Sequence, residues 1–170
     1  NSNFKDSREL IKTNSNFGKA SVDFELTNKL IADYFISNKS QVVLLPGFIA
    51  SDEHQNTTTL GRGGSDYTAA IIANGTKSNA LEIWTDVNGM FTANPKIVKQ
   101  AQPIESISYQ EAMELSHFGA KVLYPPTIQP VLNSQIPIWI KNTFEPQAFG
   151  TYISNENQAS NNPIKGISHI

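Results

Sequence analysis

The run Thr-Thr-Thr-Leu-Gly-Arg-Gly-Gly-Ser-Asp occupies residues 57–66 and sets the local structure in the middle of the chain. Glycine has no Cβ, so the three glycines of this run let the backbone turn where other residues would clash. Ser65 or Asp66 then suits the cap of a helix that ends near residues 74–75, where Asn is followed by Gly. The run therefore predicts a Gly-rich loop that leads into the N-terminus of a helix.

Helical patterns and short apolar runs alternate along the rest of the chain. Helical patterns occupy residues 21–37, 108–119 and 127–132, and apolar runs typical of strands occupy residues 41–45, 80–85 and 136–141. The run at 41–45 suits a strand buried on both faces, and residues 108–111 form a capping box. Strands that alternate with helices indicate βαβ crossovers, so we expect an α/β fold with a mostly parallel sheet.

The composition excludes several classes of protein. The chain has 13 Lys and Arg against 15 Asp and Glu, with no basic run, which argues against a nucleic-acid or membrane-surface partner. It has no cysteine, so disulfides, thiolate nucleophiles and zinc–thiolate sites are excluded. No apolar run approaches the roughly 20 residues of a membrane span. The three histidines lie far apart in sequence, so no metal site is predicted.

The Gly-rich loop predicts an anionic ligand. Glycines turn backbone N–H groups outward, and the helix N-terminus that follows favours negative charge. Arg62 adds a planar fork suited to a carboxylate or a phosphate. The loop is not a Walker A motif, because Gly-x-x-x-x-Gly-Lys-Ser/Thr is absent. The alternative is a plain connecting loop with a solvated Arg62.

Two further segments carry candidate binding residues. Residues 84–96 begin at the end of a predicted strand, and ligands usually bind at the carboxyl ends of parallel strands. Asp86 there could hold a ribose, a metal-bound water or a cation, and Lys96 could meet a phosphate; alternatively, Asp86 caps a turn and Lys96 lies on the surface. Lys121 follows a predicted helix, where a cation is favoured without any binding role.

Taken together, these segments resemble the amino acid kinase family, and within it the aspartokinases. The resemblance rests on Thr-Thr-Thr-Leu-Gly-Arg-Gly-Gly-Ser-Asp at 57–66, Trp-Thr-Asp-Val at 84–87 and Phe-Gly-Ala-Lys-Val-Leu at 118–123. Residues 108–116, 140–143 and 164–168 look closest to the bifunctional aspartokinase–homoserine dehydrogenases. The resemblance covers nearly the whole chain, from about Asp6 onward.

The resemblance implies a fold and a reaction. The fold is a three-layer sandwich, in which helices flank a mostly parallel sheet. The reaction transfers the γ-phosphoryl group of ATP, with Mg²⁺, to the side-chain carboxylate of L-aspartate, the first step towards threonine, lysine and methionine. The family further implies a cytoplasmic homo-oligomer, and NADP would serve only a dehydrogenase part that this chain lacks.

The family's functional positions map onto two sets of residues. Those matching the aspartate site are Phe48, Arg62, Gly63, Gly64, Ser65 and Asp66. Those matching nucleotide contacts are Thr85, Asp86, Phe91, Lys96 and Lys121. Arg62 would grip a substrate carboxylate, and Asp66 would have the catalytic role of orienting lysines around the transferred group. The family more often has Tyr at Phe91, Asp at Asn94 and Arg at Lys96, so these positions bear on nucleotide affinity.

Matching the family along the chain predicts its domain organisation. Residues 1–153 match the carboxyl-terminal part of the kinase domain, 154–163 a linker and 164–170 the start of an ACT-type regulatory region. The family's Lys-Phe-Gly-Gly strand is not among these residues, so we expect residues 1–170 alone to be inactive. The alternatives are a sibling kinase for another carboxylate or a nucleotide, and a nucleotide-binding or assembly module without catalysis.

Overall fold

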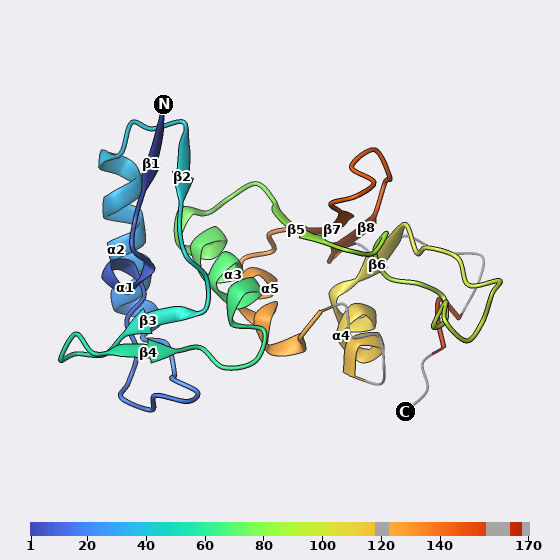
Figure 1. Cartoon of the computed structure of the whole chain (residues 1–170), viewed down its shortest axis with the longest axis horizontal. Coiled ribbons are helices and arrows are strands. Elements are labelled where there is room, and N and C mark those ends of the chain that lie inside the picture. The colour runs from blue at the N-terminus through green and yellow to red at the C-terminus, as the bar shows by residue number, and fades with distance from the viewer. Residues whose placement is uncertain (118–122, 156–163, 168–170) are drawn as a thin grey trace. The chain divides into compact units, whose positions relative to one another are not determined.

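The computed structural model describes residues 1–117, 123–155 and 164–167, which form two compact units at residues 1–78 and 79–170 (Figure 1). The first unit contains β1 (Ser2–Phe4), α1 (Ser7–Leu10), α2 (Phe24–Ser37), β2 (Val42–Leu44), β3 (Ile49–Ser51), β4 (Thr57–Thr59) and α3 (Gly64–Thr76). The second contains β5 (Leu81–Thr85), β6 (Ser106–Ser108), α4 (Tyr109–His117), the 3₁₀ turn η1 (Pro125–Thr127), α5 (Gln129–Asn133), β7 (Ile138–Asn142) and β8 (Thr151–Ser154). No helix in these described stretches is long and apolar enough to span a membrane.

In the first unit, helices α2 and α3 pack against each other around a small apolar core. Its buried members are Leu10, Ile11, Ile31, Ala50, Leu60 and Ile71. The close approach of the helices depends on Gly75, because a Cβ built there would lie 2.8 Å from Ile31 Cγ2. Helix α2 begins later than residue 21, since the Asp23 carboxylate accepts a hydrogen bond from Leu26 N at 3.0 Å and caps the helix.

Strand β2 lies within the predicted run at 41–45, but the prediction that it is buried on both faces is wrong. Val42 is 59% exposed and Leu44 is 65% exposed. Among the described residues, β2 pairs in parallel with β1 and with no other strand. A continuous apolar run shows that a strand is favoured, but it does not show how many neighbours cover that strand.

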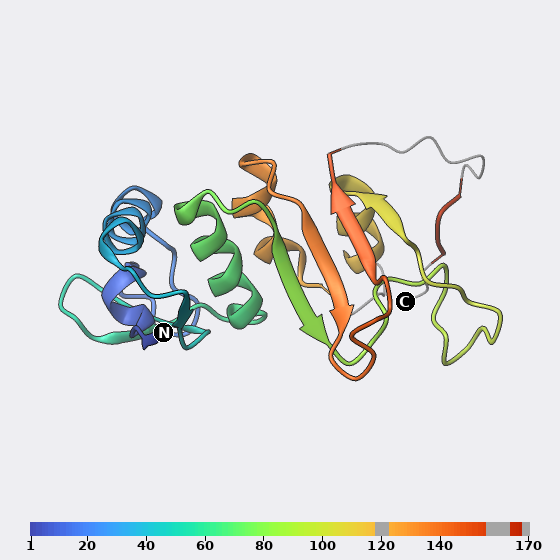
Figure 2. The same cartoon turned by 90° about the horizontal axis from the view of Figure 1, so that it is seen from above.

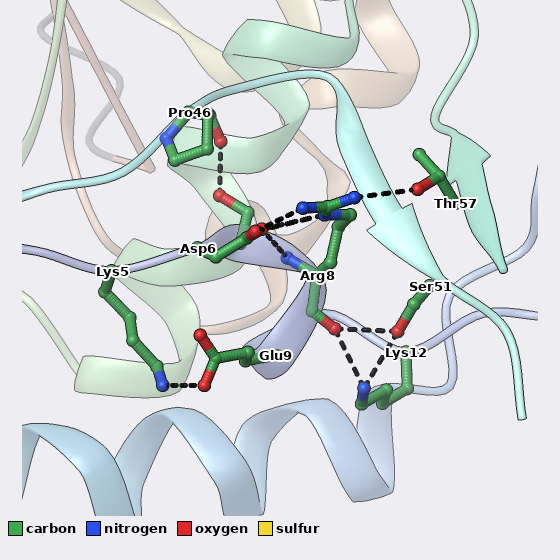
Figure 3. Close-up of polar contacts among 9 residues, drawn as sticks. Lys5, Asp6, Arg8, Glu9, Lys12, Pro46, Ser51 and Thr57 are labelled. Atoms are coloured by element: carbon green, nitrogen blue, oxygen red, sulfur yellow. Dashed lines mark hydrogen bonds and ion pairs between the residues drawn. The ribbon is translucent and has the colours of Figure 1, made fainter. Parts of the chain in front are cut away.

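A short antiparallel hairpin, β3–β4, was not predicted, and β4 takes the first three residues of the run expected to form the Gly-rich loop. Its tip is closed by Asp52, whose Oδ1 accepts hydrogen bonds from the backbone N–H groups of His54 and Asn56 at 3.0 and 2.8 Å. Helix α1 anchors both strands, as Figure 3 shows: Arg8 Nη1 donates to Thr57 Oγ1 at 3.0 Å. Ser51 Oγ of β3 donates to Arg8 O at 2.7 Å, and Lys12, which follows α1, donates through Nζ to the same hydroxyl at 2.8 Å. The hairpin therefore fixes where the Gly-rich loop starts.

The second unit is built on a four-stranded sheet with the order β5-β7-β8-β6 (Figure 2). The pairs β5–β7 and β6–β8 are parallel, whereas β7–β8 is antiparallel. With β1–β2 also parallel, the prediction of an α/β fold with mostly parallel pairing is confirmed. Side chains of one sheet face, among them Ile83, Ile138, Ile140 and Ile153, are buried.

The capping box predicted at residues 108–111 is confirmed at the start of α4. Ser108 N donates to Glu111 Oε2 at 2.8 Å, and Glu111 N donates to Ser108 Oγ at 3.2 Å. The expected helix end at Gly119 lies outside the described residues, as do residues 156–163 of the linker expected at 154–163, whereas Ser154 is the last residue of β8. The short helix expected over 127–132 is observed as α5, preceded by the turn η1.

Candidate functional site

An open pocket of about 450 Å³ lies in the first unit, around the loop that joins β4 to α3. It is lined by Phe48, Gly61, Arg62, Gly63, Gly64, Ser65 and Asp66. All six residues of the predicted substrate set thus lie together. Gly61 was missing from that set, although it is the first glycine of the quoted run.

The loop turns at two glycines in the left-handed region of backbone space. Gly61 has φ 76° and Gly63 has φ 70°, a conformation that other residues adopt only with strain. Gly63 is the N-cap residue of α3 and no side chain caps this helix, so the prediction that Ser65 or Asp66 caps it is wrong. The left-handed Gly63 starts the helix earlier, which places Ser65 and Asp66 inside its first turn. Gly64 N donates to Gly61 O at 3.0 Å, so the N–H groups of Ser65 and Asp66 are the ones at this helix start that suit an anion.

Phe48 forms one wall of the pocket in an unusual backbone conformation. Its φ is 76°, although it is a bulky residue. A Cβ built on Gly64 would lie 2.6 Å from Phe48 Cδ2, so the ring rests directly on the start of α3. Leu60 N donates to Phe48 O at 3.0 Å. Glycine at position 64 is therefore required for the wall and the loop to meet.

The pocket combines an exposed cation with a half-buried acid. Arg62 is exposed, which leaves its guanidinium within reach of solvent and of a small carboxylate. Burial raises the pKa of the Asp66 carboxyl above its ordinary value of 3.8. A cation placed beside Asp66 would favour its charged form, so this residue is suited to hold a cation near a ligand.

In the second unit, Thr85 and Asp86 stand at the carboxyl end of β5. Thr85 Oγ1 donates to Asp86 Oδ1 at 3.2 Å, and Thr143 N donates to Thr85 O at 2.8 Å. The end of β5 is therefore tied to the end of β7, while Asp86 itself is exposed. This is the place in an open α/β sheet where ligands usually bind.

The loop after β5 is anchored to its neighbours by amide side chains. Asn142, which is buried, donates through Nδ2 to Asn88 Oδ1 at 2.6 Å. Asn88 Nδ2 in turn donates to Glu145 Oε2 at 2.9 Å. These bonds order the loop next to Asp86, and the sequence alone did not indicate Asn88 or Asn142.

The remaining nucleotide-set residues lie further along the chain. Phe91 is half-buried and forms an isolated antiparallel bridge with Pro103. Lys96 is exposed, and its backbone N–H donates to Asn94 Oδ1 at 3.0 Å. Lys121 lies outside the described residues. The structure thus places four of the five residues on β5 and the segment that follows it.

Residues 164–167 contact this segment and α4. Ile167 N donates to Thr92 O at 2.8 Å, and Lys165 Nζ donates to Glu111 Oε2 at 3.1 Å. Glu111 is also the acidic member of the capping box, so one carboxylate serves both the helix start and the later segment. Within the described ranges, no three His, Asp or Glu side chains gather into a metal-binding group.

Known proteins resemble the chain in both sequence and structure. The sequence profile of the amino acid kinase family matches residues 4–142. The chain is 44% identical over 163 residues to a bifunctional aspartokinase/homoserine dehydrogenase of Buchnera aphidicola. It is 40% identical over 154 residues to the lysine-sensitive aspartokinase 3 of Escherichia coli. The two alignments cover 96% and 90% of this chain.

Among solved structures, a crystal structure of E. coli aspartokinase III in complex with aspartate and ADP matches with a TM-score of 0.86 at 40% identity. It matches 92% of this chain, so the two share one fold. The chain spans only part of each protein: 20% of the Buchnera protein, 34% of aspartokinase 3 and 35% of the crystallised chain.

Proposed function

Because the chain belongs to the amino acid kinase family, we propose that it is part of an aspartate kinase. In the reaction, the side-chain carboxylate of L-aspartate attacks the γ-phosphorus of ATP, the bond to the β–γ bridging oxygen breaks, and ADP leaves. One observation carries the proposal: the pocket formed by Phe48 and residues 61–66, which offers backbone N–H groups and Arg62 to a small carboxylate.

The proposed substrate pocket has to bind and orient aspartate, and it needs no base to activate it. A free carboxylate with a pKa near 4 is already ionised at neutral pH. Phosphoryl transfer then depends on positioning and on positive charge. Arg62 grips one carboxylate of aspartate, the α3 N-terminus supports negative charge, and Asp66 orients lysines around the transferred group.

The nucleotide is assigned to the end of β5 and the segment that follows it, through Thr85, Asp86, Phe91 and Lys96, and to Lys121 further along the chain. Asp86 is exposed at the strand end and suits a ribose hydroxyl or a water bound to Mg²⁺. Mg²⁺ arrives with ATP, because it prefers phosphate oxygens and water with only one or two carboxylates. When bound, Mg²⁺ neutralises phosphate charge. Because one or two carboxylates are enough to hold it, the assignment needs no group of three metal-binding side chains, and the described residues contain none.

The proposed aspartate kinase function also implies a location, a pathway step and a domain organisation for the parent protein. The parent protein acts in the cytoplasm, at the first step towards threonine, lysine and methionine, and carries a homoserine dehydrogenase part that uses NADP. It assembles as a homo-oligomer. Residues 1–153 belong to the kinase domain, 154–163 to a linker and 164–170 to an ACT-type regulatory region. That residues 1–170 alone are inactive stays a prediction.

The proposal is tested with the protein encoded by the whole reading frame. Aspartyl phosphate is trapped with hydroxylamine while L-aspartate, other amino-acid carboxylates and nucleoside monophosphates are offered with MgATP. We expect turnover with L-aspartate and at least a tenfold rise in its KM for Arg62→Ala, because a hydrogen-bonded charge pair is lost. The control is Lys29→Ala, which removes an exposed positive charge on α2, outside the pocket.

The two alternatives give different results in the same assay. A sibling kinase would turn over another carboxylate or a nucleotide in preference to L-aspartate. A module without catalysis would bind ATP and turn over none of the acceptors. Either result would overturn the proposed reaction.

A further inference from the structure

Thr68 is a buried residue on the second turn of α3, and it belongs to none of the predicted site sets. Only 4% of it is exposed. Its hydroxyl accepts a hydrogen bond from Phe48 N at 2.9 Å and donates one to Gly64 O at 2.8 Å. One side chain therefore joins the pocket wall to the first residue of the helix that starts at the Gly-rich loop.

Phe48 needs such a partner, because its backbone conformation is unfavourable. A bulky residue with positive φ persists only where its surroundings determine it. Two hydrogen bonds fix its peptide groups: Thr68 accepts from its N–H, and Leu60 N donates to its C=O at 3.0 Å. Of these two, only the first comes from a side chain, so only the first can be removed by substitution without altering the backbone.

The position of Phe48 matters because the space around it is tightly filled. A Cβ on Gly64 would lie 2.6 Å from Phe48 Cδ2, and a Cβ on Gly47 would lie 3.0 Å from Ser65 Cα. A small movement of Phe48 would therefore open a gap over Gly64 or displace the loop. Either change alters the pocket that Arg62 and the α3 N-terminus form.

We propose that Thr68 is a positioning residue that holds Phe48 as the wall of the substrate pocket and so sets the affinity for L-aspartate without touching it. This inference rests on the proposed aspartate kinase function. It assigns to Thr68 an effect on one substrate only, since its partners Phe48 and Gly64 both line the aspartate pocket.

The test compares three variants of the whole protein. Thr68→Val keeps the shape and removes both hydrogen bonds, whereas Thr68→Ser keeps the hydroxyl. Thr76→Val is the matched control: Thr76 also donates to the carbonyl four residues earlier on α3, at 2.8 Å, but its other bonds are to Ala73 and Ser78. The Thr76→Val variant therefore measures the effect of losing a side-chain hydrogen bond within α3 that does not involve Phe48.

We expect Thr68→Val to raise the KM for L-aspartate roughly three- to tenfold, which corresponds to one buried hydrogen bond. The KM for ATP should stay within about twofold of the wild type. Thr68→Ser should restore the KM for aspartate, and Thr76→Val should leave it unchanged. In hydrogen-exchange measurements, the Phe48 amide should exchange faster in Thr68→Val and not in Thr76→Val, because only the former loses its acceptor.

Several results would overturn the inference. An unchanged KM for aspartate in Thr68→Val would do so, as would equal rises for aspartate and ATP, which indicate general damage to the fold. So would an unaltered exchange rate at Phe48. A wild-type protein that forms no aspartyl phosphate would instead refute the proposed function, and the substrate role of Thr68 with it.

Discussion

Gly89 and Thr151 lie so close that a Cβ built on Gly89 would stand 2.3 Å from Thr151 Oγ1 and 2.8 Å from Thr151 N. Gly89 also has φ 100°, a conformation that L side chains rarely adopt. Thr151 is fully buried, and its hydroxyl accepts a bond from Met90 N at 2.8 Å and donates one to Ile104 O at 2.6 Å. The loop after β5 is thus fastened to β8 by a contact that only glycine permits.

We therefore predict that Gly89→Ala destabilises the second unit by about 2–4 kcal/mol, since it adds both backbone strain and a clash in a filled space. Urea unfolding followed by tryptophan fluorescence measures this effect selectively, because both tryptophans, Trp84 and Trp139, belong to the second unit. Gly18→Ala is the control, since a Cβ there meets nothing within 4 Å. Equal stability of the two variants would contradict the prediction.

Local signals in the sequence predicted local structure well. The capping box at 108–111 was found correctly, because Ser108 and Glu111 complete it with their own backbone groups. The start of α3 was misplaced, because a left-handed Gly63 competes with any side-chain cap and sequence alone does not report φ. Hairpin β3–β4 was missed because each of its strands is only three residues long, although the three threonines of β4 suit a strand.

For the candidate site, the sequence predicted every lining residue of the pocket except Gly61, and it gave no sign of the contacts that hold Phe48 in place. Residues 62–66 came from the motif and Phe48 from the family resemblance, and the structure brings them together. Thr68 has no signal in the sequence, because a threonine inside a helix usually bonds only to its own helix. Its role depends on Phe48, which is 20 residues away, and only the fold brings the two together.

Glu111 leads to a prediction about pH. Partial burial raises the pKa of its carboxyl, but hydrogen bonds from Ser108 and the Lys165 ammonium outweigh burial and lower it below its ordinary value of 4.5. The unfolded chain then binds the proton more readily, so this contribution to stability is present above pH 4.5 and is lost as pH falls through the lowered pKa. Glu111→Gln removes the charge but keeps an acceptor for Ser108 N.

The expected loss for Glu111→Gln is below about 1 kcal/mol at pH 7, since the ion pair is only partly buried, and it should shrink towards zero at acid pH. Urea unfolding at several pH values checks this. Glu114→Gln, an exposed position on the same helix, serves as the control. A loss that does not change with pH would show that the charge of Glu111 contributes nothing.

Asp86 should matter for nucleotide affinity if the loop after β5 binds ATP. Asp86→Asn is expected to weaken ATP binding about tenfold or more, because a charged acceptor for a hydroxyl or a metal-bound water is lost. Calorimetric titration of MgATP measures this effect. The control is Glu105→Gln, which also removes one exposed negative charge from the second unit. Equal affinity in both variants would remove Asp86 from the site.

Asp66 is expected to show opposite effects on stability and on activity. Burial raises the pKa of its carboxyl above 3.8, so the folded state holds the proton more tightly than the unfolded state does. The stability penalty of the charged form is therefore absent below pH 3.8, grows as pH rises through the raised pKa, and is fully present above it. Asp66→Asn removes that penalty and should stabilise the first unit at pH 7.

The same variant should lower kcat roughly a hundredfold, because a neutral amide no longer orients the lysines around the transferred group. Thermal unfolding at pH 7 and pH 3, together with aspartyl phosphate formation, checks both halves. Asp33→Asn, at an exposed position on α2, is the matched control and should change neither. A variant that loses stability along with activity would contradict the prediction. It would show that the charged Asp66 carboxylate stabilises the fold.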